Sequence, residues 1–392
     1  MNGIPVVVIA YNRERALKRL LFSLAGADYP EGSDVTLIIS IDKSDNEGVL
    51  ETAREFDWEY GEKRIITHAE RLGLKRHVLE CGDHSEEYGS VILLEDDLFV
   101  APDFYNYASA ALDFTGADSR VGGVSLYNHL LNVHVREPFF AIEDGFDSYY
   151  MQLASSWGQA YTREQWNGFA KWMENASEDS LTGMRIPENV RGWSESSWLK
   201  YNIAYLIERD MYFLYPRTSL TTNFMSEGEH SGGEDNDLQV PLGIFAKKEY
   251  RFGRPEGSSA IYDAFFENTC LKALIAERFS LPEQEICIDL YGCRSGQISK
   301  GTQGISFLLS PEPLPFKVLA SYGRRLRPVD ANIIFAAEGR DFFLYDLREG
   351  SRAPGVDKGE RYLYNYRALS FKKIRDILGY RLRKYVRDFR SN

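Results

Sequence analysis

Three adjacent carboxylates follow an apolar run in the first quarter of the chain. Residues 91–98 read Val-Ile-Leu-Leu-Glu-Asp-Asp-Leu, so the run ends at Glu95, Asp96 and Asp97. Clustered like charges repel one another and lose hydration when buried, unless a cation joins them. A hard divalent cation with oxygen ligands is the simplest such partner. The alternative interpretation is a solvated loop whose acids face water.

A strand must position these acids. Four apolar residues bounded by polar ones are typical of a strand buried on both faces, as in a parallel α/β sheet. In open α/β sheets, ligands bind beside the C-terminal ends of the strands. The sequence therefore predicts a binding site at the end of this strand.

Further strands and helices alternate before it. We expect strands at 4–10, 35–41 and 64–66, and helices at 47–56 and 74–82. After the first strand, leucines at helical spacing mark one face of another helix, at Leu17, Leu20, Leu21 and Leu24. This alternation predicts a doubly wound parallel sheet.

The loops after these strands carry neither a Gly-rich dinucleotide fingerprint nor a Walker loop. They offer polar side chains instead, at Asn12, Arg13, Asp42 and Asp45. A nucleotide bound at this edge would have to use such side chains.

Beyond residue 100 the pattern is mixed. We expect helices at 104–114, from about 163, and at 198–208, and strands at 121–127 and 211–215, with an irregular aromatic stretch at 139–150. The Gly- and acid-rich segment 226–237 is typical of a loop or lid. The first domain is therefore expected to span 1–245, with a nucleotide half at 1–100 and an acceptor half at 101–245.

A separate small α/β or β-rich module is expected at 255–347, with short strands at 286–290, 305–309, 331–336 and 341–345. Acceptor docking and dimerisation, and hence a homo-oligomer, are the roles considered for it. A basic amphipathic helix is expected within 360–392. From 371 to 392 there are eight Lys or Arg residues and two Asp. Such a helix is typical of a peripheral membrane anchor, and packing on the body or on a partner subunit is the alternative.

Bulk properties exclude several classes. The 392 residues carry a net charge of -12, which argues against generic nucleic-acid binding. No stretch approaches the ~20 apolar residues of a membrane span. Because the first strand starts at residue 4, we expect no signal peptide and a cytoplasmic protein. The four cysteines lack zinc-type spacing, and reduced thiols are expected.

Together these motifs resemble the GT-A-fold nucleotide-sugar glycosyltransferases of family 2 type. The nearest pattern is that of the inverting enzymes typified by N-acetylglucosaminyltransferase I, and the resemblance covers residues 1 to about 235. It is carried by 5–13 (Pro-Val-Val-Val-Ile-Ala-Tyr-Asn-Arg), 39–42, 95–98 with 101–104, Ser156-Trp157-Gly158 with Trp166, Tyr215-Pro216, Ser219, Asn223 and the loop to His230. It implies a GT-A-type mixed sheet with a nucleotide half and an acceptor half.

The resemblance also implies roles in donor binding. The last acid of the triplet, Asp97, would bind Mn2+ or Mg2+ on the sugar-nucleotide diphosphate, and His230 is a further candidate ligand. The donor pocket would be lined by Ala10, Tyr11, Arg13, Asp42, Arg71, Lys75, Glu95 and Asp96. A divalent ion suits this chemistry because the diphosphate gains negative charge as it leaves.

An inverting transfer also needs a general base near the acceptor hydroxyl. By position in the family pattern the candidate is Glu195, although relatives carry Asp there; Asp235 and Asp237 are fallbacks. The alternative is that Glu195 has no catalytic role and is an acid near the start of a helix, where the helix dipole favours negative charge. Trp157 and Gly158 would form the acceptor floor, and core packing is their alternative role.

These features predict a metal-dependent, inverting glycosyltransferase that moves a sugar from a nucleotide-sugar donor to a glycan or lipid-linked acceptor, at the inner membrane face. One alternative is a sugar-1-phosphate nucleotidyltransferase, but the first loop lacks its Gly-rich, basic signature. The other is a non-catalytic glycan-binding scaffold on a transferase fold, which the intact acids argue against.

Overall fold

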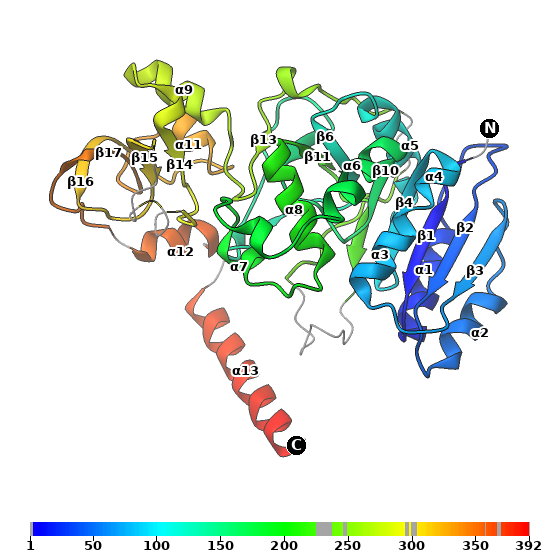
Figure 1. Cartoon of the computed structure of the whole chain (residues 1–392). Coiled ribbons are helices and arrows are strands. Elements are labelled where there is room, and N and C mark those ends of the chain that lie inside the picture. The colour runs from blue at the N-terminus through cyan, green and yellow to red at the C-terminus, as the bar shows by residue number, and fades with distance from the viewer. Residues whose placement is uncertain are drawn as a thin grey trace. The chain divides into compact units, whose positions relative to one another are not determined.

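The structure is a computed structural model that describes residues 3–224, 237–245, 249–294, 298, 304–356, 358–366 and 370–391. It divides into two compact units, Met1–Leu274 and Ile275–Asn392 (Figure 1). The boundary lies later than residue 255, where the sequence analysis begins the appended module. The reason is that residues 261–262 join the large sheet.

The first unit is built on one large sheet. Its strands are β1 Val6–Ala10, β2 Leu37–Ile41, β3 Lys63–Thr67, β4 Ser90–Glu95, β6 Val121–Ser125, β9 Ser148–Met151, β10 Gln159–Thr162, β11 Tyr212–Pro216 and β13 Ile261–Tyr262. Within the described residues the order is β13-β9-β11-β6-β10-β4-β1-β2-β3. β1 to β4 pair in parallel, whereas β10 runs antiparallel to both β4 and β6. The expected mixed sheet of a GT-A-type fold is confirmed.

Helices cover both faces of this sheet, because alternate residues of a strand point to opposite sides. On one side Val6 and Val8 share a core cluster with Leu17 and Leu20 of α1. On the other side Ser40 Oγ lies 2.8 Å from His77 Nε2 of α3. The helices of the unit are α1 Glu14–Ala25, α2 Glu47–Glu55, α3 Leu74–Gly82, α4 Ser85–Tyr88, α5 Phe104–Thr115, α6 Arg163–Met173, α7 Glu188–Arg191 and α8 Trp198–Arg209.

Two small strand pairs and two 3₁₀ turns complete this unit. The strands are β5 Leu98–Val100 paired with β12 Thr221–Asn223, and β7 Leu131–Asn132 paired with β8 Glu137–Pro138. The turns are η1 Asp179–Leu181 and η2 Pro255–Gly257. Because β5 follows the three acids directly and pairs with β12, this strand pair fixes the direction in which the chain leaves the acidic triplet.

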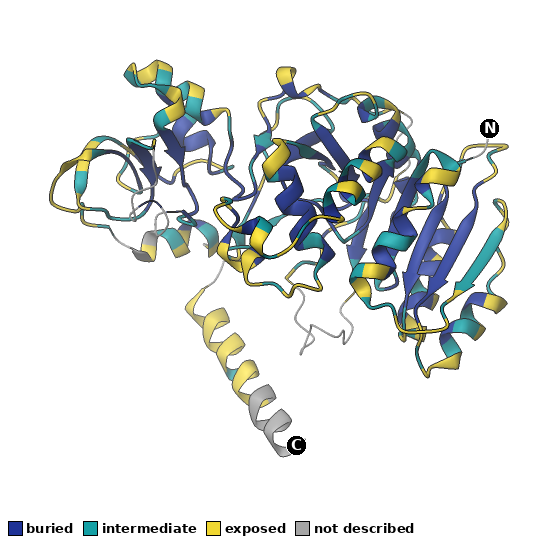
Figure 2. Cartoon of the chain, in the orientation of Figure 1, coloured by how far each residue is buried: buried dark blue, intermediate teal, exposed yellow. Residues whose placement is uncertain are grey.

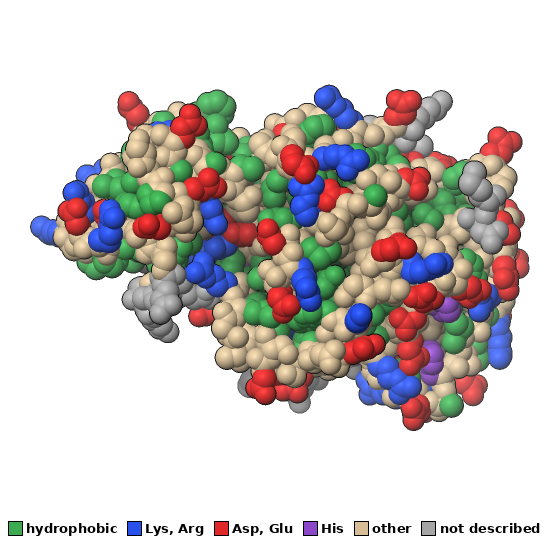
Figure 3. All heavy atoms as spheres, turned by 45° about the horizontal axis from the view of Figure 1, so that its top comes forward, with side chains coloured by type: hydrophobic (Ala, Val, Ile, Leu, Met, Phe, Trp, Pro, Cys, Tyr) green, Lys and Arg blue, Asp and Glu red, His purple; other side chains and the backbone are tan. Residues whose placement is uncertain are grey.

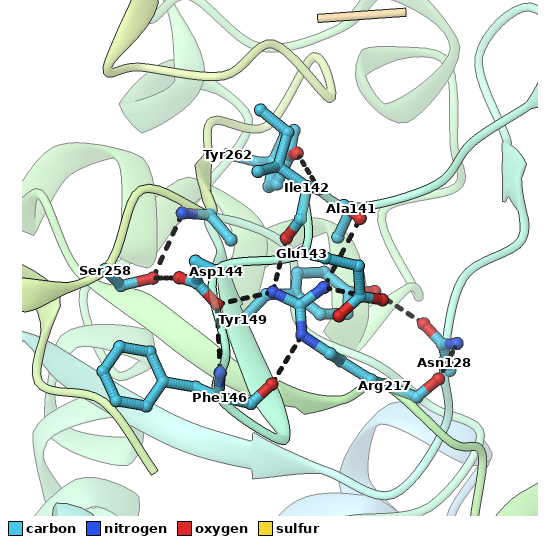
Figure 4. Close-up of polar contacts among 11 residues, drawn as sticks. Asn128, Ala141, Ile142, Glu143, Asp144, Phe146, Tyr149, Arg217, Ser258 and Tyr262 are labelled. Atoms are coloured by element: carbon cyan, nitrogen blue, oxygen red, sulfur yellow. Dashed lines mark hydrogen bonds and ion pairs between the residues drawn. The ribbon is translucent and has the colours of Figure 1, made fainter. Parts of the chain in front are cut away.

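The irregular stretch 139–147 is held by Arg217, which follows β11 (Figure 4). Its guanidinium donates to the carbonyls of Phe146 (2.8 Å) and Ile142 (2.5 Å) and to Asp144 Oδ1 (2.8 Å). Ser258 Oγ donates to the other Asp144 oxygen at 2.6 Å. Hydrogen bonds from side chains to backbone carbonyls thus take the place of the β-sheet hydrogen bonds that this loop lacks.

The second unit contains a smaller sheet in the order β14-β15-β17-β16 within the described residues. Its strands are β14 Ile286–Ile288, β15 Phe307–Ser310, β16 Phe316–Tyr322 and β17 Phe342–Gly350; α9 Leu271–Phe279 spans the unit boundary and η3 Glu283–Glu285 precedes β14. The expected strand at 331–336 is wrong, because Ala331–Ile334 forms helix α11. Its Asn332 side chain binds the backbone of Leu326 and Val329 and stabilises a turn there. A short apolar run does not distinguish a strand from a helix turn.

The chain ends in two helices, α12 Lys358–Tyr366 and α13 Phe371–Ser391. Figure 2 shows β1, β2 and β4 buried and the described part of α13 exposed. From 371 to 383, every side-chain-bearing residue of α13 is exposed, including Phe371, which is 85% exposed. Among the described helices, none combines the length and apolar character that crossing a bilayer requires.

Candidate active site

The carboxyl ends of β1, β2 and β4 meet at one edge of the large sheet. In their parallel register Ala10 lies opposite Ile41, and Ile9 lies opposite Glu95. The residues that follow each strand are therefore neighbours. Tyr11, Asp42 and Asp96 come from three separate stretches of sequence and reach the same edge.

Arg13 joins two of the three acids. Its Nη1 donates to Asp97 Oδ2 at 2.8 Å, and its Nη2 forms a short ion pair with Asp96 Oδ1. The Tyr11 backbone N–H donates to the other Asp96 oxygen at 3.4 Å. A planar guanidinium that bridges two carboxylates offsets much of their mutual repulsion. Tyr11, Arg13, Asp96 and Asp97 are thus in contact with one another, and Ala10 precedes Tyr11 at the end of β1.

Burial raises the pKa values of Asp96 and Glu95 to different extents. Burial raises the pKa of Asp96, which is 1% exposed, to about 6, although the charge of Arg13 opposes the rise. Burial, together with the charge of Asp97, raises the pKa of Glu95 to about 8. Glu95 Oε1 is buried and has no hydrogen-bond partner within the described part of the chain. Glu95 can therefore hold a proton at neutral pH and donate a hydrogen bond.

Asp97 is accessible, because its side chain is 26% exposed. Its backbone carbonyl accepts from Phe224 N–H at 3.1 Å, which extends the β5–β12 pairing. No group of three or more His, Cys, Asp or Glu side chains suited to a metal lies within the described residues. One exposed carboxylate nevertheless fits Mg2+ or Mn2+, since such ions keep several waters and take further ligands from substrate phosphates. His230 and Asp235, named as candidates above, lie outside the described residues.

Asp42 ties β2 to the turn before α3. Its carboxylate accepts from the backbone N–H groups of Lys43 (2.8 Å), Leu72 (2.8 Å) and Gly73 (3.0 Å). Burial disfavours its charge, but these bonds outweigh that effect and lower its pKa. Asp42 is 4% exposed. It lies at the end of β2, as the sequence analysis expects. In the structure its hydrogen bonds hold the 71–75 turn in position.

That turn brings two cations to the edge. The Arg71 guanidinium lies 4.8 Å from the centre of the Tyr11 ring. Lys75 Nζ lies 4.1 Å from the centre of the Tyr201 ring and donates to the carbonyl of Glu195 at 3.3 Å. Burial lowers the pKa of Lys75, against the charges of Glu178 and Glu195. The segment from Arg71 to Lys75 is therefore in contact with both Tyr11 at the strand edge and the Glu195 segment.

Glu195 lies between α7 and α8, in a segment that Lys200 anchors. Lys200 of α8 is 1% exposed, and its Nζ donates to both Glu178 oxygens (2.7 and 2.9 Å) and to the Trp193 carbonyl (2.9 Å). Glu195 itself is exposed. Among the described residues, its backbone carbonyl accepts a hydrogen bond from Lys75, and no hydrogen bond joins it to the acidic triplet. The fallback Asp237 forms an ion pair with Arg136.

Trp157 and Gly158 precede β10 at the same edge of the sheet. The Trp157 ring lies 4.7 Å from the Tyr127 ring and 5.8 Å from His129, and it is only partly buried. Gly158 has φ +93°, and a Cβ there would lie 2.8 Å from Thr221 Cγ2. Glycine is thus required both by the backbone conformation and by the close approach of β12.

Some residues of this region escaped the sequence analysis. His129 is 2% exposed, and neither ring nitrogen has a hydrogen-bond partner among the described residues. Burial, with His134 nearby, lowers its pKa to about 3. Ser44 Oγ donates to the Tyr11 carbonyl at 3.2 Å, and the Asn46 amide donates to the Asn12 carbonyl at 2.9 Å. The polar residues Ser44 and Asn46 follow the strand that ends at Asp42. They are the one sequence signal that could have indicated these two hydrogen bonds.

A protein-family model covers the part of the chain that forms this edge. Residues 6–155 match the family model "Glycosyl transferase family 2". An Arabidopsis thaliana alpha-1,3-mannosyl-glycoprotein 2-beta-N-acetylglucosaminyltransferase is 26% identical over 205 residues, which are 48% of this chain and 43% of the relative. The chain thus spans less than half the length of that curated relative.

Two solved structures are similar over about half of the chain. S. aureus TarS 1-349 in complex with UDP-GlcNAc is 14% identical, with a TM-score of 0.36 over 58% of this chain and 60% of the other. The mannosyltransferase PcManGT from Pyrobaculum calidifontis, in complex with GDP-Man and Mn2+, is 17% identical, with a TM-score of 0.30 over 42% and 46%.

The mixed sheet and the match to the family model indicate a domain with the GT-A glycosyltransferase fold. The match to the glycosyl transferase family 2 model lies within the first unit and covers less than half of the chain.

Proposed function

We propose that the protein is a metal-dependent, inverting glycosyltransferase that moves a hexosyl or N-acetylhexosaminyl unit from a nucleotide-sugar donor to a glycan or lipid-linked acceptor in cell-surface polysaccharide synthesis. The observation that carries the proposal is the edge where Arg13 meets Asp96 and Asp97 beside Asp42. This edge offers both a carboxylate for a cation and a guanidinium for a diphosphate.

The donor would lie along this edge. Arg13 and Arg71 provide positive charge for the diphosphate, and guanidinium groups bind phosphate oxygens in a bidentate manner. Glu95, protonated, and Asp96 can hydrogen bond to ribose hydroxyls. A Mn2+ or Mg2+ ion held by Asp97 would supply Lewis-acid stabilisation to the leaving diphosphate. Asp42 keeps the 71–75 turn in place, so that Arg71 and Lys75 face the donor.

The acceptor would approach from the Trp157 side, where an aromatic ring can stack on a sugar. Glu195 would remove the proton from the attacking hydroxyl. The new glycosidic bond forms as the bond between the anomeric carbon and the diphosphate oxygen breaks, and the proton moves to the Glu195 carboxylate. The Lys75 contact with the Glu195 carbonyl supports this role, because it connects the base segment to the donor edge.

Asp97→Ala tests the proposal. We expect Mn2+-dependent hydrolysis of UDP-GlcNAc or GDP-mannose by the full chain, with kcat/KM reduced ~100-fold or more in the variant, as for loss of a group that stabilises transition-state charge. Asp113→Ala, an exposed acid on α5, is the control and should keep wild-type activity. Hydrolysis that Asp97→Ala leaves unchanged, or a wild-type protein inactive on every nucleotide sugar tried, would contradict it.

We further propose that α13 places the protein on the inner face of a membrane. Its eight basic residues and two acids between 371 and 392 favour anionic lipid. Phe371, Leu378 and Leu382 are 85%, 57% and 67% exposed, so that they are free to enter the headgroup region. Attachment of this kind would bring the active site to a lipid-linked acceptor.

A further inference from the structure

A hollow lies in the first unit, between α6 and α8. It has a volume of about 610 Å³ and shares no residue with the acidic edge. Gly168, Lys171, Trp172 and Asn175 reach it at helical spacing from α6 and from the residues just beyond its end, and Tyr205 reaches it from α8. On the face of the molecule drawn in Figure 3, hydrophobic side chains lie among acidic and basic ones. Its volume lies within the range typical of small-molecule sites, about 300–1,000 Å³.

Two aromatic rings form its wall. The rings of Trp172 and Tyr205 lie 5.8 Å apart at an interplanar angle of 53°. Gly168 makes room for the tyrosine, because a Cβ at that position would lie 2.6 Å from Tyr205 Oη. Tyr205 is 6% exposed, whereas Trp172 is only partly buried. One ring is thus fixed by packing and the other offers a face to solvent.

Polar groups at the rim carry donors and acceptors. Among the described residues, the indole N–H of Trp172, the hydroxyl of Tyr205 and the side-chain amide of Asn175 make no hydrogen bond. Glu208 and Arg209 also line the hollow and form a loose pair at 3.6 Å. Lys171 adds a further donor. The rim therefore holds both kinds of hydrogen-bonding group with nearly balanced charge.

We propose that this hollow binds a neutral hexose or N-acetylhexosamine unit of a glycan chain. A pyranose ring has an apolar face of C–H groups that suits an aromatic wall, and hydroxyls around its edge that suit an amide, a carboxylate and cations. A lipid tail would leave these polar groups unsatisfied. The lining has a net charge of only +1, from Lys171 and Arg209 against Glu208, which is too small to neutralise a nucleotide diphosphate. The hollow then holds the acceptor chain at a point away from the reacting end.

This inference rests on the proposed function for the identity of the glycan as acceptor, but its test is a binding measurement without donor. Chitotetraose and α-mannotriose are titrated into the full chain by isothermal titration calorimetry. We expect weak binding of at least one of them, reduced 10-fold or more in Trp172→Ala and about 3-fold in Asn175→Ala; alanine at an exposed amide leaves the fold intact. Trp172→Phe should restore most of the affinity, because it keeps an aromatic face.

Phe22→Ala removes an aromatic side chain that is 73% exposed on α1 and should bind as wild type does. Equal binding by wild type and Trp172→Ala, or no binding of either oligosaccharide by wild type, would overturn the inference. A bound fatty acid that the oligosaccharides do not displace would also overturn it. Because Asp97→Ala should keep glycan binding, failure here and failure of the proposed transfer reaction give different results.

Discussion

At the scale of single residues, Arg13 offsets the repulsion between Asp96 and Asp97, which would otherwise require a bound metal ion. It is paired with Asp96 and Asp97, so that the acids tolerate one another before any ligand binds. The same guanidinium is a natural partner for a diphosphate. Donor binding can therefore draw Arg13 toward the phosphates and leave Asp97 open to a cation. The cation therefore need not bind beside an unpaired arginine, and the diphosphate need not bind beside unpaired carboxylates.

A second residue-scale feature leads to a pH prediction. His129 lies among Tyr127, Trp157, Tyr215 and Phe266, and its pKa is about 3 because burial disfavours the cation, with His134 adding repulsion. An exposed histidine titrates near 6.5.

Between these values the unfolded chain binds the extra proton and the native protein does not, so that native stability falls as pH falls below ~6.5. In His129→Phe we expect the loss of unfolding free energy between pH 7 and pH 5 to shrink by about 2 kcal/mol. Urea unfolding at both pH values measures it. An unchanged difference would show that His129 does not resist protonation in the native state.

At the scale of elements, α3 connects the two halves of the site. Its first turn carries Lys75, which contacts Tyr201 and the Glu195 segment, and the turn before it is held by Asp42. Its last turn packs on α6, where a Cβ at Gly82 would lie 1.9 Å from the Trp166 ring. A shift of this helix would therefore move donor and acceptor groups together.

The segment that carries Glu195 depends on one buried cation. In Lys200→Met the Trp193 carbonyl and Glu178 lose their shared donor. We expect amide hydrogen exchange over residues 178–197 to accelerate ~10-fold or more, as for a local opening made easier by ~1.4 kcal/mol. If Glu195 is the base, kcat should fall more than KM rises.

The matched control is Lys18→Met, which changes an exposed lysine on α1 and should leave exchange over 178–197 unchanged. Equal exchange in Lys200→Met and wild type would contradict the anchoring role of Lys200.

At the scale of the whole molecule, the chain joins a transferase unit to a second unit with its own sheet and a basic C-terminal helix. If α13 is an anchor, a chain truncated before Phe371 should keep donor hydrolysis and lose binding to vesicles with anionic lipid. Flotation with vesicles containing phosphatidylglycerol measures this, and binding of the full chain should weaken at high salt. Equal flotation of both chains would remove the anchor from the proposal.

Much of the fold could be predicted because local patterns are strong in the first hundred residues. The runs that became β1, β2 and β4 are apolar on both faces, and the leucines of α1 are all buried in the core. Such runs indicate buried parallel strands, whose C-terminal ends must share an edge. The family resemblance placed Arg13 and Asp96 in one donor pocket, but the ion pair between them was not predicted. The 331–336 run was misread because its Asn332 anchor acts through backbone groups that no periodicity reveals.

By itself, the sequence determined which strands end in acids, because the period of hydrophobicity and the position of charge are local properties. The tertiary structure alone decided that Asp42 binds the backbone of the 71–75 turn, that Lys75 reaches the Glu195 segment, and that α6 and α8 leave a hollow between them. Each of these involves groups that are 30 or more residues apart in sequence, and their meeting depends on how helices pack on the sheet, which no local pattern encodes.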